Sequence, residues 1–449
     1  MTLLTDIRVV EAELSTTRVT YRAPLKFGGR VLRDAVIADV TVTVESAAGR
    51  RAAGHGSMPV GNVWAWPSNR VPTDQTLTAM LRFAELAVDQ VTRITGAGHP
   101  LELSEQLSSC FARWADEVGR QLALPEPIPR LAQLVAASPV DAAIHDAYGK
   151  VHGTNSYLLL GSDYIRRDLS TFLDERFRGE YLDRYTLADP KPRMPLYHLV
   201  GALDPLDDSD VGEPIGDGLP ETLAQWIAFN GLTHLKIKLA GDDLAWDVDR
   251  VVRVEQVAAE AQARRGCSQW VYSLDFNERC ESVDYVLEFL DQVRQRSPRA
   301  WERIQYIEQP THRDLAGHRE QKMHRASQLK PVVIDESLVD YESLLLARDM
   351  GYSGVALKAC KGHAESLLLG AAAQKFQMFL CVQDLTCVGA SFLHSASLSA
   401  RIPTVAAVEG NGRQYCPAGN HGWESRYPGM FQIRDGQVQT GLLCGAGLY

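Results

Sequence analysis

Charged residues recur at regular intervals in the second half of the chain, and each one closes a short apolar run. They follow one another at intervals of 23 to 37 residues. The series consists of Lys238, Asp275, Glu308, Asp335, Lys358, Asp384 and Glu409. Three consecutive members are carboxylates, and carboxylates that converge in a low-dielectric site cannot all ionise unless a cation lies between them. Oxygen ligands without histidine or thiol favour Mg²⁺ over zinc. The series therefore predicts a site for one Mg²⁺, with Mn²⁺ as a substitute, held by Asp275, Glu308 and Asp335.

Lysines flank these carboxylates in the sequence. Lys236 and Lys238 alternate with aliphatic residues in the run LTHLKIKL (232–239). Side chains alternate between the two faces of a strand, so both ammonium groups point the same way. Two like charges in a protein interior cost free energy unless an anionic group lies opposite them. One alternative is a solvated edge strand, but the apolar flanks favour a buried site built around an anion.

A divalent cation placed between lysines suits the removal of a proton next to a carboxylate. The cation neutralises the charge that develops as the carboxylate enolises. A neutral lysine can then take the α-proton, and crowding by a second cation lowers the pKa of such a lysine. Lys238 and Lys358 close different runs and could reach the two faces of one α-carbon. This arrangement predicts a racemase or epimerase that works through an enediolate.

The elements that must position these residues are eight short apolar runs after about residue 194. These runs are MPLYHLVGAL, LTHLKIKLA, QWVYSLDFN, RIQYIEQP, KPVVIDES, GVALKACK, MFLCVQDLT and TVAAVEGN. Helical patterns lie between most of them, and apolar strands separated by helices predict a parallel sheet. Eight such units predict an α/β fold with a (β/α)8 barrel of the TIM type. The strand ends of a barrel converge on one face, which would gather the charged series into one cup.

The part of the chain before the barrel is predicted to be an N-terminal α+β capping domain, residues 1–160. Ala35–Glu45 alternates like a strand, and the residues RAAGHG that follow predict a turn and a return strand. Helical spacing predicts helices over Thr76–Gly96 and over Ser138–Val151, the second capped by Ser-Pro-Val-Asp. The barrel domain would then cover 161–414. We expect the tail, about 415–449, to pack back on the capping domain.

Composition excludes several classes of function. The chain has 449 residues, 45% of them hydrophobic, and a formal net charge of −10, which argues against nucleic acid bound through a general basic surface. No apolar stretch is long enough for a membrane span, and the first residues carry acidic groups where a secretory signal has its apolar core. Eight cysteines are scattered without metal or disulfide spacing. We therefore expect reduced thiols and a cytoplasmic protein.

These motifs resemble those of the enolase superfamily, specifically its muconate lactonizing enzyme subgroup. The barrel runs contain KIK, LDFNE, IEQP, IDES and ALKACKG in the order of that family, and SPVDAAIHDAYGKVHGTNSYLLLG resembles its capping-domain helix. The resemblance implies that Lys238 and Lys358 are the acid/base pair and that Asp275, Glu308 and Asp335 hold Mg²⁺. It further implies that Lys236 positions the substrate carboxylate and depresses the pKa of Lys238. Members of the family are usually homo-oligomers.

Three departures from the family pattern stand out. GHGS (Gly54–Ser57) replaces a usual Gly-x-Gly-Glu, so one polar contact is expected to be absent. The seventh run ends in QDLT, whose lack of histidine argues against the mandelate-racemase and sugar-acid dehydratase branches. The acidic linker LDPLDDSDVGEPIGDGLP (203–220) is longer than usual and is expected to form a rim or lid at the barrel mouth.

The residues that would select the substrate are less sharply indicated than the acid/base pair. We expect the loops at about 24–34 and 55–70 to supply them, and the candidates there are Lys26, Phe27, Arg30 and Trp64. Asp384 and Glu409 are expected to line the pocket, either in contact with substrate or paired with a lysine. Glu336 is expected to support the site from behind or to act as a capping group, and Lys361 is expected to be a rim or capping residue instead of a base.

Alternative functions remain open at this point. One lysine could act as base and the other as a passive cation, which would give a cycloisomerase or a syn-dehydratase of the muconate lactonizing or o-succinylbenzoate synthase type. A barrel that only binds a small-molecule carboxylate is the alternative from a different class. The same lysine pair would serve each of the enzymes.

Overall fold

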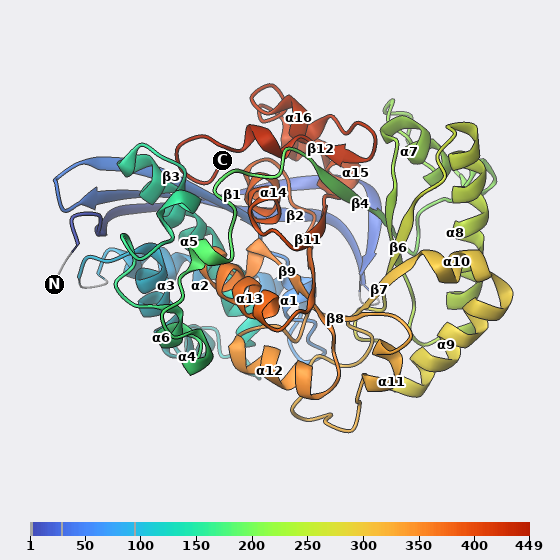
Figure 1. Cartoon of the computed structure of the whole chain (residues 1–449), viewed down its shortest axis with the longest axis horizontal. Helices are drawn as coiled ribbons and strands as arrows, with labels where there is room; N and C mark the ends of the chain where they lie inside the picture. The colour runs from blue at the N-terminus through green and yellow to red at the C-terminus, as the bar shows by residue number, and fades with distance from the viewer. Residues whose placement is uncertain (1–2, 28–29, 94–95) are drawn as a thin grey trace.

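The N-terminal part of the chain is a three-stranded antiparallel sheet covered by helices (Figure 1). The computed structural model describes every residue except 1–2, 28–29 and 94–95. The strands are β1 (Ile7–Phe27), β2 (Arg30–Ser46) and β3 (Arg51–Pro59), in the order β1-β2-β3. The predicted strand and return strand are confirmed as β2 and β3. β1 is an addition that the sequence analysis lacked, because the middle of this strand is exposed and carries no continuous apolar face.

Five helices follow the sheet. They are α1 (Asn62–Ala65), α2 (Thr73–Val91), α3 (Pro100–Ser109), α4 (Phe111–Gln121) and α5 (Arg130–His152). The helix expected over Thr76–Gly96 corresponds to α2. The helix expected to begin at Ser138 was placed wrongly, since α5 begins at Arg130 and Pro139 lies inside it.

Pro139 is tolerated inside α5 for a local reason. A proline has no N–H to donate to the carbonyl four residues earlier, here that of Val135. The hydroxyl of Ser138 donates a hydrogen bond of 2.8 Å to this carbonyl instead. Almost all of α5 is buried, so packing on every side holds the helix together across the proline. The Ser-Pro pair therefore lets the helix continue at the residue where the sequence pattern suggests that a helix begins.

Two glycines of β3 allow the sheet to lie directly against α5. A Cβ atom on Gly54 would overlap the carbonyl oxygen of Ala143, and one on Gly56 would overlap that of Pro139. These neighbours are helix backbone and cannot swing aside. The Gly-x-Gly part of the GHGS segment thus serves the packing of the capping domain.

Gly56→Ala is expected to destabilise the protein by about 3 kcal/mol, because the added methyl forces β3 away from α5. Gly119→Ala is the matched control. Gly119 lies in α4 with no atom within 4 Å of the added methyl, so a small gain in stability is expected there. Urea unfolding of both variants measures the difference. Equal stabilities would show that β3 and α5 do not pack this closely.

The C-terminal part is a closed barrel of eight parallel strands, as predicted. The strands are β4 (Met194–Val200), β5 (His234–Lys238), β6 (Val271–Asp275), β7 (Ile304–Glu308), β8 (Val332–Ile334), β9 (Gly354–Leu357), β10 (Phe379–Val382) and β11 (Val405–Glu409). Pairing of β11 with β4 closes the ring. The longer helices between the strands are α7 (Leu223–Asn230), α8 (Leu244–Arg264), α9 (Val283–Arg296), α12 (Tyr341–Asp349), α13 (His363–Lys375) and α14 (Ala390–Arg401).

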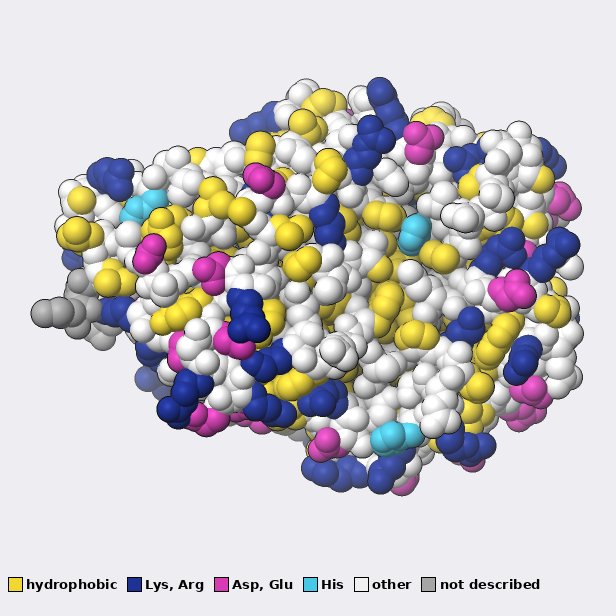
Figure 2. All heavy atoms as spheres, in the orientation of Figure 1, with side chains coloured by type: hydrophobic (Ala, Val, Ile, Leu, Met, Phe, Trp, Pro, Cys, Tyr) yellow, Lys and Arg dark blue, Asp and Glu magenta, His cyan; other side chains and the backbone are white. Residues whose placement is uncertain are grey.

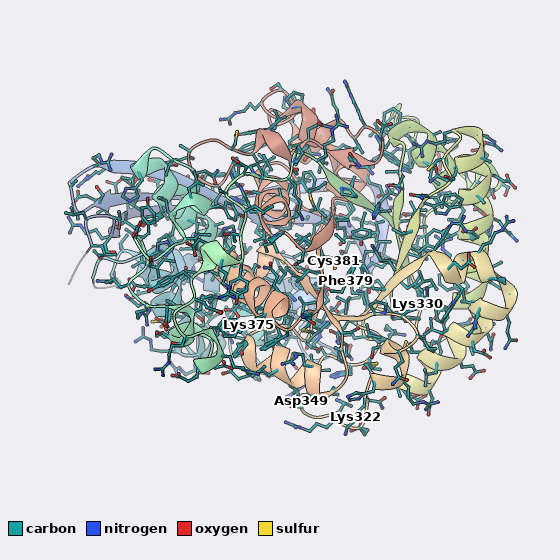
Figure 3. All side chains as sticks on the ribbon, in the orientation of Figure 1. Lys322, Lys330, Asp349, Lys375, Phe379 and Cys381 are labelled. Atoms are coloured by element: carbon teal, nitrogen blue, oxygen red, sulfur yellow. The ribbon has the colours of Figure 1, made fainter. Side chains whose placement is uncertain are left out.

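Side chains fill the interior of the ring. One buried cluster joins Tyr197, Tyr306, Val333, Ala356, Cys381 and Ala407, with Phe379 packed against it. Phe379 and Cys381 of β10 are labelled in Figure 3. This layer closes the barrel on the amino side of the strand ends, so any site must lie at the carboxyl ends.

The C-terminal segment contacts both parts of the molecule. Its strand β12 (Gln437–Val438) pairs antiparallel with β4. Near the end of the chain, the backbone N–H of Leu448 donates to Asp146 of α5 at 3.0 Å. In Figure 1 this segment, with α15 (Gly412–Tyr415) and α16 (Pro428–Phe431), lies along one side of the barrel.

Charged side chains are spread over the face of the molecule that Figure 2 draws. Basic and acidic side chains are interspersed on the face drawn in Figure 2. In the described part of the chain, no helix has the length and apolarity that crossing a membrane requires. All eight cysteines are free thiols, and five of them are buried.

Candidate active site

The ends of three adjacent strands bring the first site residues together. The strand register places Lys238 of β5 beside Asp275 of β6, and Asp275 beside Glu308 of β7. Asp335 and Lys358 each follow directly after a strand, β8 and β9. In the order of the ring, β5 and β9 are four strands apart and so face each other. The candidate lysines therefore lie on opposite sides of the row of carboxylates.

Lys236 is at the centre of the polar network. Its ammonium lies 2.8 Å from Glu308, 3.1 Å from Asp275 and 3.2 Å from Glu409. It also donates to the side-chain oxygen of Gln383 at 2.8 Å. Only 1% of Lys236 is exposed. These carboxylate partners compensate the cost of burying the charge. They are the anionic groups that the sequence analysis expected opposite the lysines of KIK.

Lys238 contacts Asp275 and Asn277 at the end of β5. Its ammonium contacts Asp275 at 2.5 Å and the side-chain oxygen of Asn277 at 2.9 Å. Asn277 has a left-handed backbone with φ of 44° and a backbone N–H that donates to Asp275 at 2.8 Å. The sequence analysis quoted Asn277 only as part of LDFNE and gave it no role. The sequence did offer one indication of a role for Asn277, since it lies two residues after Asp275, the carboxylate at the end of a strand.

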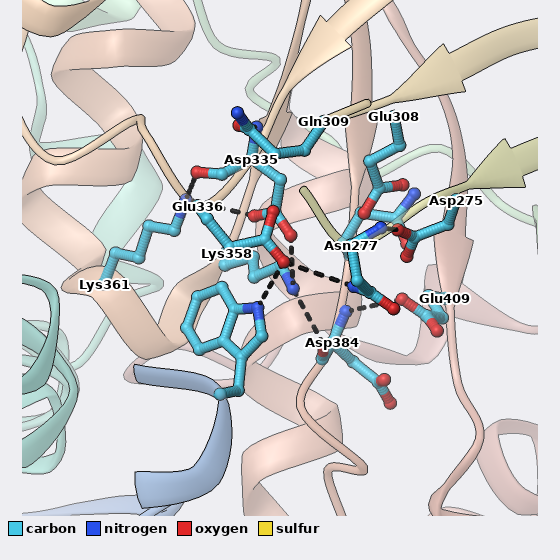
Figure 4. A network of polar contacts seen from close by, with 12 residues as sticks. Asp275, Asn277, Glu308, Gln309, Asp335, Glu336, Lys358, Lys361, Asp384 and Glu409 are labelled. Atoms are coloured by element: carbon cyan, nitrogen blue, oxygen red, sulfur yellow. Dashed lines mark hydrogen bonds and ion pairs between the residues drawn. The ribbon is translucent and has the colours of Figure 1, made fainter. Parts of the chain in front are cut away.

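Asp335 lies between two lysines. Lys358 is 2.9 Å from Asp335, and Lys361 is 3.1 Å from its other carboxylate oxygen. Lys361 also donates to the main-chain carbonyl of Asp335 at 2.5 Å. Lys361 is 2% exposed, so of the two positions expected for it the rim is wrong. A short 3-10 turn, Ala359–Lys361, directs its side chain inward (Figure 4).

The carboxylate trio has the donor chemistry of a magnesium site, although ammonium groups now lie against it. Across the described residues, no group of histidine, cysteine, aspartate and glutamate side chains has the arrangement of a formed metal site. One Glu308 oxygen, Oε2, is nonetheless buried without a hydrogen-bond partner among the described residues. An orphaned carboxylate oxygen beside two further carboxylates is what a hard cation would bind. The residues present therefore fit Mg²⁺.

The pKa values of the trio are divided, since those of Asp275 and Asp335 are lowered by nearby lysines and that of Glu308 is raised. Burial, followed by the nearby charge of Asp275, raises the pKa of Glu308 well above its ordinary range. Burial also acts to raise the pKa of Asp335, but Lys358 and Lys361 outweigh it and bring that pKa down to about 2. One carboxyl of the cluster thus resists ionisation while another stays charged, as expected for carboxylates that share a site.

The electrostatics of Lys358 differ from the sequence expectation. Burial and the charge of Lys236 both act to lower the pKa of Lys358. The Asp335 carboxylate outweighs them, so the pKa of Lys358 is raised above its ordinary value. The pKa of Lys236 is raised as well, because Glu308 and Glu409 outweigh its burial. Crowding by a second cation therefore does not make Lys358 a base in this charge state of the cluster.

A cavity lies between the barrel mouth and the capping domain. Lys236, Lys238 and Lys358 line it on the barrel side, together with Asp384 and Glu409. The capping domain supplies a mainly apolar wall that includes Tyr21, Leu25, Leu32, Val36, Val63, Trp64 and Leu77, together with the polar residues Asp34 and Asn62. The cavity therefore joins a charged floor to an apolar roof.

The remaining candidate substrate-binding residues differ in whether they line the cavity. Burial, followed by the charge of Glu409, raises the pKa of Asp384 to about 7. Lys26 is exposed and is not among the described residues that line the cavity. Arg30 donates to Thr73 and to the Ser68 carbonyl, which ties down the loop before α2. The side chain of Phe27 lies outside the described residues.

Two further residues support the site from behind. Glu336 accepts hydrogen bonds from Trp64 at 2.9 Å and from Asn277 at 3.2 Å. Burial, followed by the charge of Asp335, raises the pKa of Glu336 to about 7. The supporting position expected for Glu336 agrees with these contacts. Gln383, which donates to Tyr306 and accepts from Lys236, was not singled out by the sequence.

The long acidic linker between β4 and α7 also contacts the capping domain. Asp217 forms an ion pair with Arg22 of β1 at 2.5 Å. At its other end, Asp204 accepts hydrogen bonds from Tyr415 at 2.5 Å and from the Gly201 N–H at 2.8 Å. The linker is thus fastened to β1 at one end and to α15 and the residue after β4 at the other.

Comparison with known proteins places these features in a wider group. Residues 219–448 match the family model described as enolase C-terminal domain-like. No curated protein matches the chain. Among solved structures, the L-Ala-D/L-Glu epimerase from Bacillus subtilis is similar at 16% identity, with a TM-score of 0.64 and 98% of each chain covered.

Two other solved structures are similar over nearly their whole length. The dipeptide epimerase from Enterococcus faecalis V583 shares 15% identity at a TM-score of 0.63, covering 98% of this chain and 99% of its own. The muconate lactonizing enzyme from Pseudomonas fluorescens shares 15% identity at a TM-score of 0.59, covering 98% of this chain and 95% of its own. At such identities the likeness concerns the fold.

Proposed function

The chain belongs to the enolase C-terminal domain-like family, and on that premise we propose that it removes the proton α to a substrate carboxylate in a Mg²⁺-dependent reaction. The reaction passes through an enediolate and most specifically is the racemisation or epimerisation of an amino-acid derivative or hydroxy acid. Asp275, Glu308 and Asp335 would hold the metal. When bound, Mg²⁺ supplies positive charge that offsets the charge developing on the substrate carboxylate.

The placement of two lysines on facing strands carries this proposal. Lys238 and Lys358 line one cavity from β5 and β9, on opposite sides of the carboxylate row. One lysine removes the α-proton from one face, and the other returns a proton to the opposite face. General acid and base groups act in this way when each lies within reach of the proton that it transfers.

Lys236 has a different role from the other two lysines. It lies between Glu308 and Glu409 with almost no exposure, so it is poorly placed to exchange protons with solvent. It keeps its charge and helps to orient the substrate carboxylate at the floor of the cavity. Asp384 and Glu409, beside this floor, are proposed to contact polar groups of the substrate.

The shape of the cavity supports an amino-acid derivative as substrate. The floor carries the charged groups, and the roof from the capping domain is mainly apolar. A molecule with a carboxylate at one end and an apolar side chain at the other fits this division. The similarity to an L-Ala-D/L-Glu epimerase and to a dipeptide epimerase agrees with dipeptides as the first compounds to test.

A second candidate function is cycloisomerisation or syn-dehydration, with one lysine as base and the other as a passive cation. The confinement of Lys358 favours it, since Asp335 lies 2.9 Å from the ammonium and the Trp64 ring 4.2 Å from it. A lysine fixed in this way could stabilise negative charge without transferring a proton. Binding of a carboxylate without reaction is the third alternative.

Deuterium exchange distinguishes these functions. Dipeptides, N-acyl amino acids and hydroxy acids are incubated with the protein and Mg²⁺ in D2O, and the α-proton is followed by NMR. Epimerisation is expected to place deuterium at the α-carbon of both epimers from either starting compound. Exchange with retained configuration would instead indicate one active lysine. No exchange in any compound of the set would contradict the proposed function.

A further inference from the structure

Trp64 belongs to the capping domain but lies against the catalytic groups of the barrel. It is on α1, the short helix after β3, and is 2% exposed. The ammonium of Lys358 lies 4.2 Å from the centre of its ring, and that of Lys361 lies 5.6 Å away. An ammonium over an indole face is attracted by the ring quadrupole, most strongly when the pair is shielded from water.

A hydrogen bond from the edge of the indole holds the ring in its plane. Its Nε1–H donates to Glu336 at 2.9 Å, and Glu336 also accepts from the amide of Asn277 at 3.2 Å. Figure 4 shows the contact between Glu336 and Asn277, with Lys358 close to both. The ring cannot turn away from Lys358 without breaking a buried hydrogen bond to a carboxyl group.

The backbone of Trp64 is fastened to the barrel separately. Arg313 donates to the Trp64 carbonyl at 3.1 Å and also pairs with Glu278. The position of the ring is thus determined by the barrel as well as by the capping domain. Such double anchoring is unnecessary for a residue that only fills space.

Trp64 is in direct contact with Lys358, one of the two acid/base lysines. Lys358 has Trp64 as one wall of its surroundings, with Asp335 at 2.9 Å and the Asp384 carbonyl at 3.3 Å. Lys238 contacts Asp275 and Asn277, and Asn277 donates to the same Glu336 carboxyl that accepts from the Trp64 indole. A change at Trp64 therefore acts directly on one lysine.

We propose that Trp64 is a positioning residue for Lys358, so that proton transfer on the Lys358 face of the substrate depends on Trp64 while transfer on the Lys238 face does not. This inference rests on the proposed function. The ring limits the orientations of a flexible side chain and keeps water from one side of the ammonium. Orientation of a reacting group is a large part of the catalytic advantage that a site can give.

The test compares exchange from two epimers. L-Ala-L-Glu and L-Ala-D-Glu are each incubated with wild type, Trp64→Leu and Trp64→Phe in D2O with Mg²⁺, and initial rates of α-proton loss are measured. Trp64→Leu is expected to slow exchange from one epimer by roughly tenfold to thirtyfold, the loss of a shielded cation–π contact. Exchange from the other epimer should stay within about twofold. Trp64→Phe retains a ring and should recover part of the lost rate.

Trp66→Leu is the matched control. Trp66 lies two residues further along the same segment, is 2% exposed, and donates to Glu126 instead of to the site. Its substitution tests the general cost of losing a buried tryptophan here, and both epimers should then respond equally. Equal slowing of the two epimers by Trp64→Leu, or no slowing of either, would overturn the inference.

A second measurement does not depend on turnover. In protein labelled with 13C-lysine, the ε-methylene signal of Lys358, assigned with Lys358→Arg, is expected upfield because of the indole ring current. Trp64→Leu should remove this shift, whereas Trp66→Leu should not. An unshifted Lys358 signal in the wild type would refute the contact itself. If neither dipeptide exchanges but the shift is present, the proposed reaction with these compounds fails and the contact stands.

Discussion

Lys358→Ala is expected to abolish the interconversion of epimers while the remaining lysine still exchanges the α-proton of one epimer. Lys238→Ala should give the opposite result, with exchange retained from the other epimer. A positioned acid or base contributes about 10² to 10⁴ in rate, so interconversion should fall by at least that range. Initial rates of α-proton loss in D2O, measured separately for the two epimers, check both variants.

The fold is expected to survive each substitution because no carboxylate loses its last partner. Asp335 keeps Lys361 when Lys358 is removed, and Asp275 keeps Lys236 when Lys238 is removed. Lys322→Ala is a suitable control, since Lys322 is exposed and lies at the edge of the molecule (Figure 3). If Lys238→Ala or Lys358→Ala interconverts the epimers at the wild-type rate, the assignment of the acid/base pair is wrong.

Removing a carboxylate of the trio should remove Mg²⁺ binding. Glu308→Gln keeps the size of the side chain but removes the charge and the orphaned oxygen that fits a metal. A ligand at 100 times its dissociation constant stabilises the folded state by about 2.7 kcal/mol. Wild-type protein is therefore expected to gain several degrees in Tm with saturating Mg²⁺, as roughly 2–4 °C per kcal/mol applies to large domains.

Glu308→Gln should show none of this Mg²⁺-dependent gain, and its α-proton exchange should be lost together with it. EDTA should abolish exchange by the wild type, and added Mg²⁺ should restore it. Glu302→Gln, at an exposed position before the same strand, is the control and should respond to Mg²⁺ like the wild type. A wild type whose Tm ignores Mg²⁺ would contradict the assignment of the trio as metal ligands.

The sequence was sufficient to predict the barrel, because the residues of each strand indicate both its burial and the point where it ends. A strand inside a barrel is buried on both faces, so it reads as a continuous apolar run, and a charged residue marks the point where it reaches the mouth. Asp275, Glu308 and Lys238 are at such points, and their grouping follows from closure of the ring alone. The β2–β3 pair was equally visible from alternation.

Only the tertiary structure decided what surrounds these residues. Trp64 and Glu336 are 272 residues apart in the sequence, and the position of Trp64 over Lys358 depends on how the capping domain sits on the barrel. Lys361 turns inward because a short 3-10 turn follows β9, and α5 continues through Pro139 because Ser138 satisfies the carbonyl that the proline leaves free. Periodicity records whether a residue is buried, but not which distant side chain it meets. The physical reason is that burial follows from the chain's local pattern, whereas orientation and pairing follow from contacts that exist only after the domains have packed.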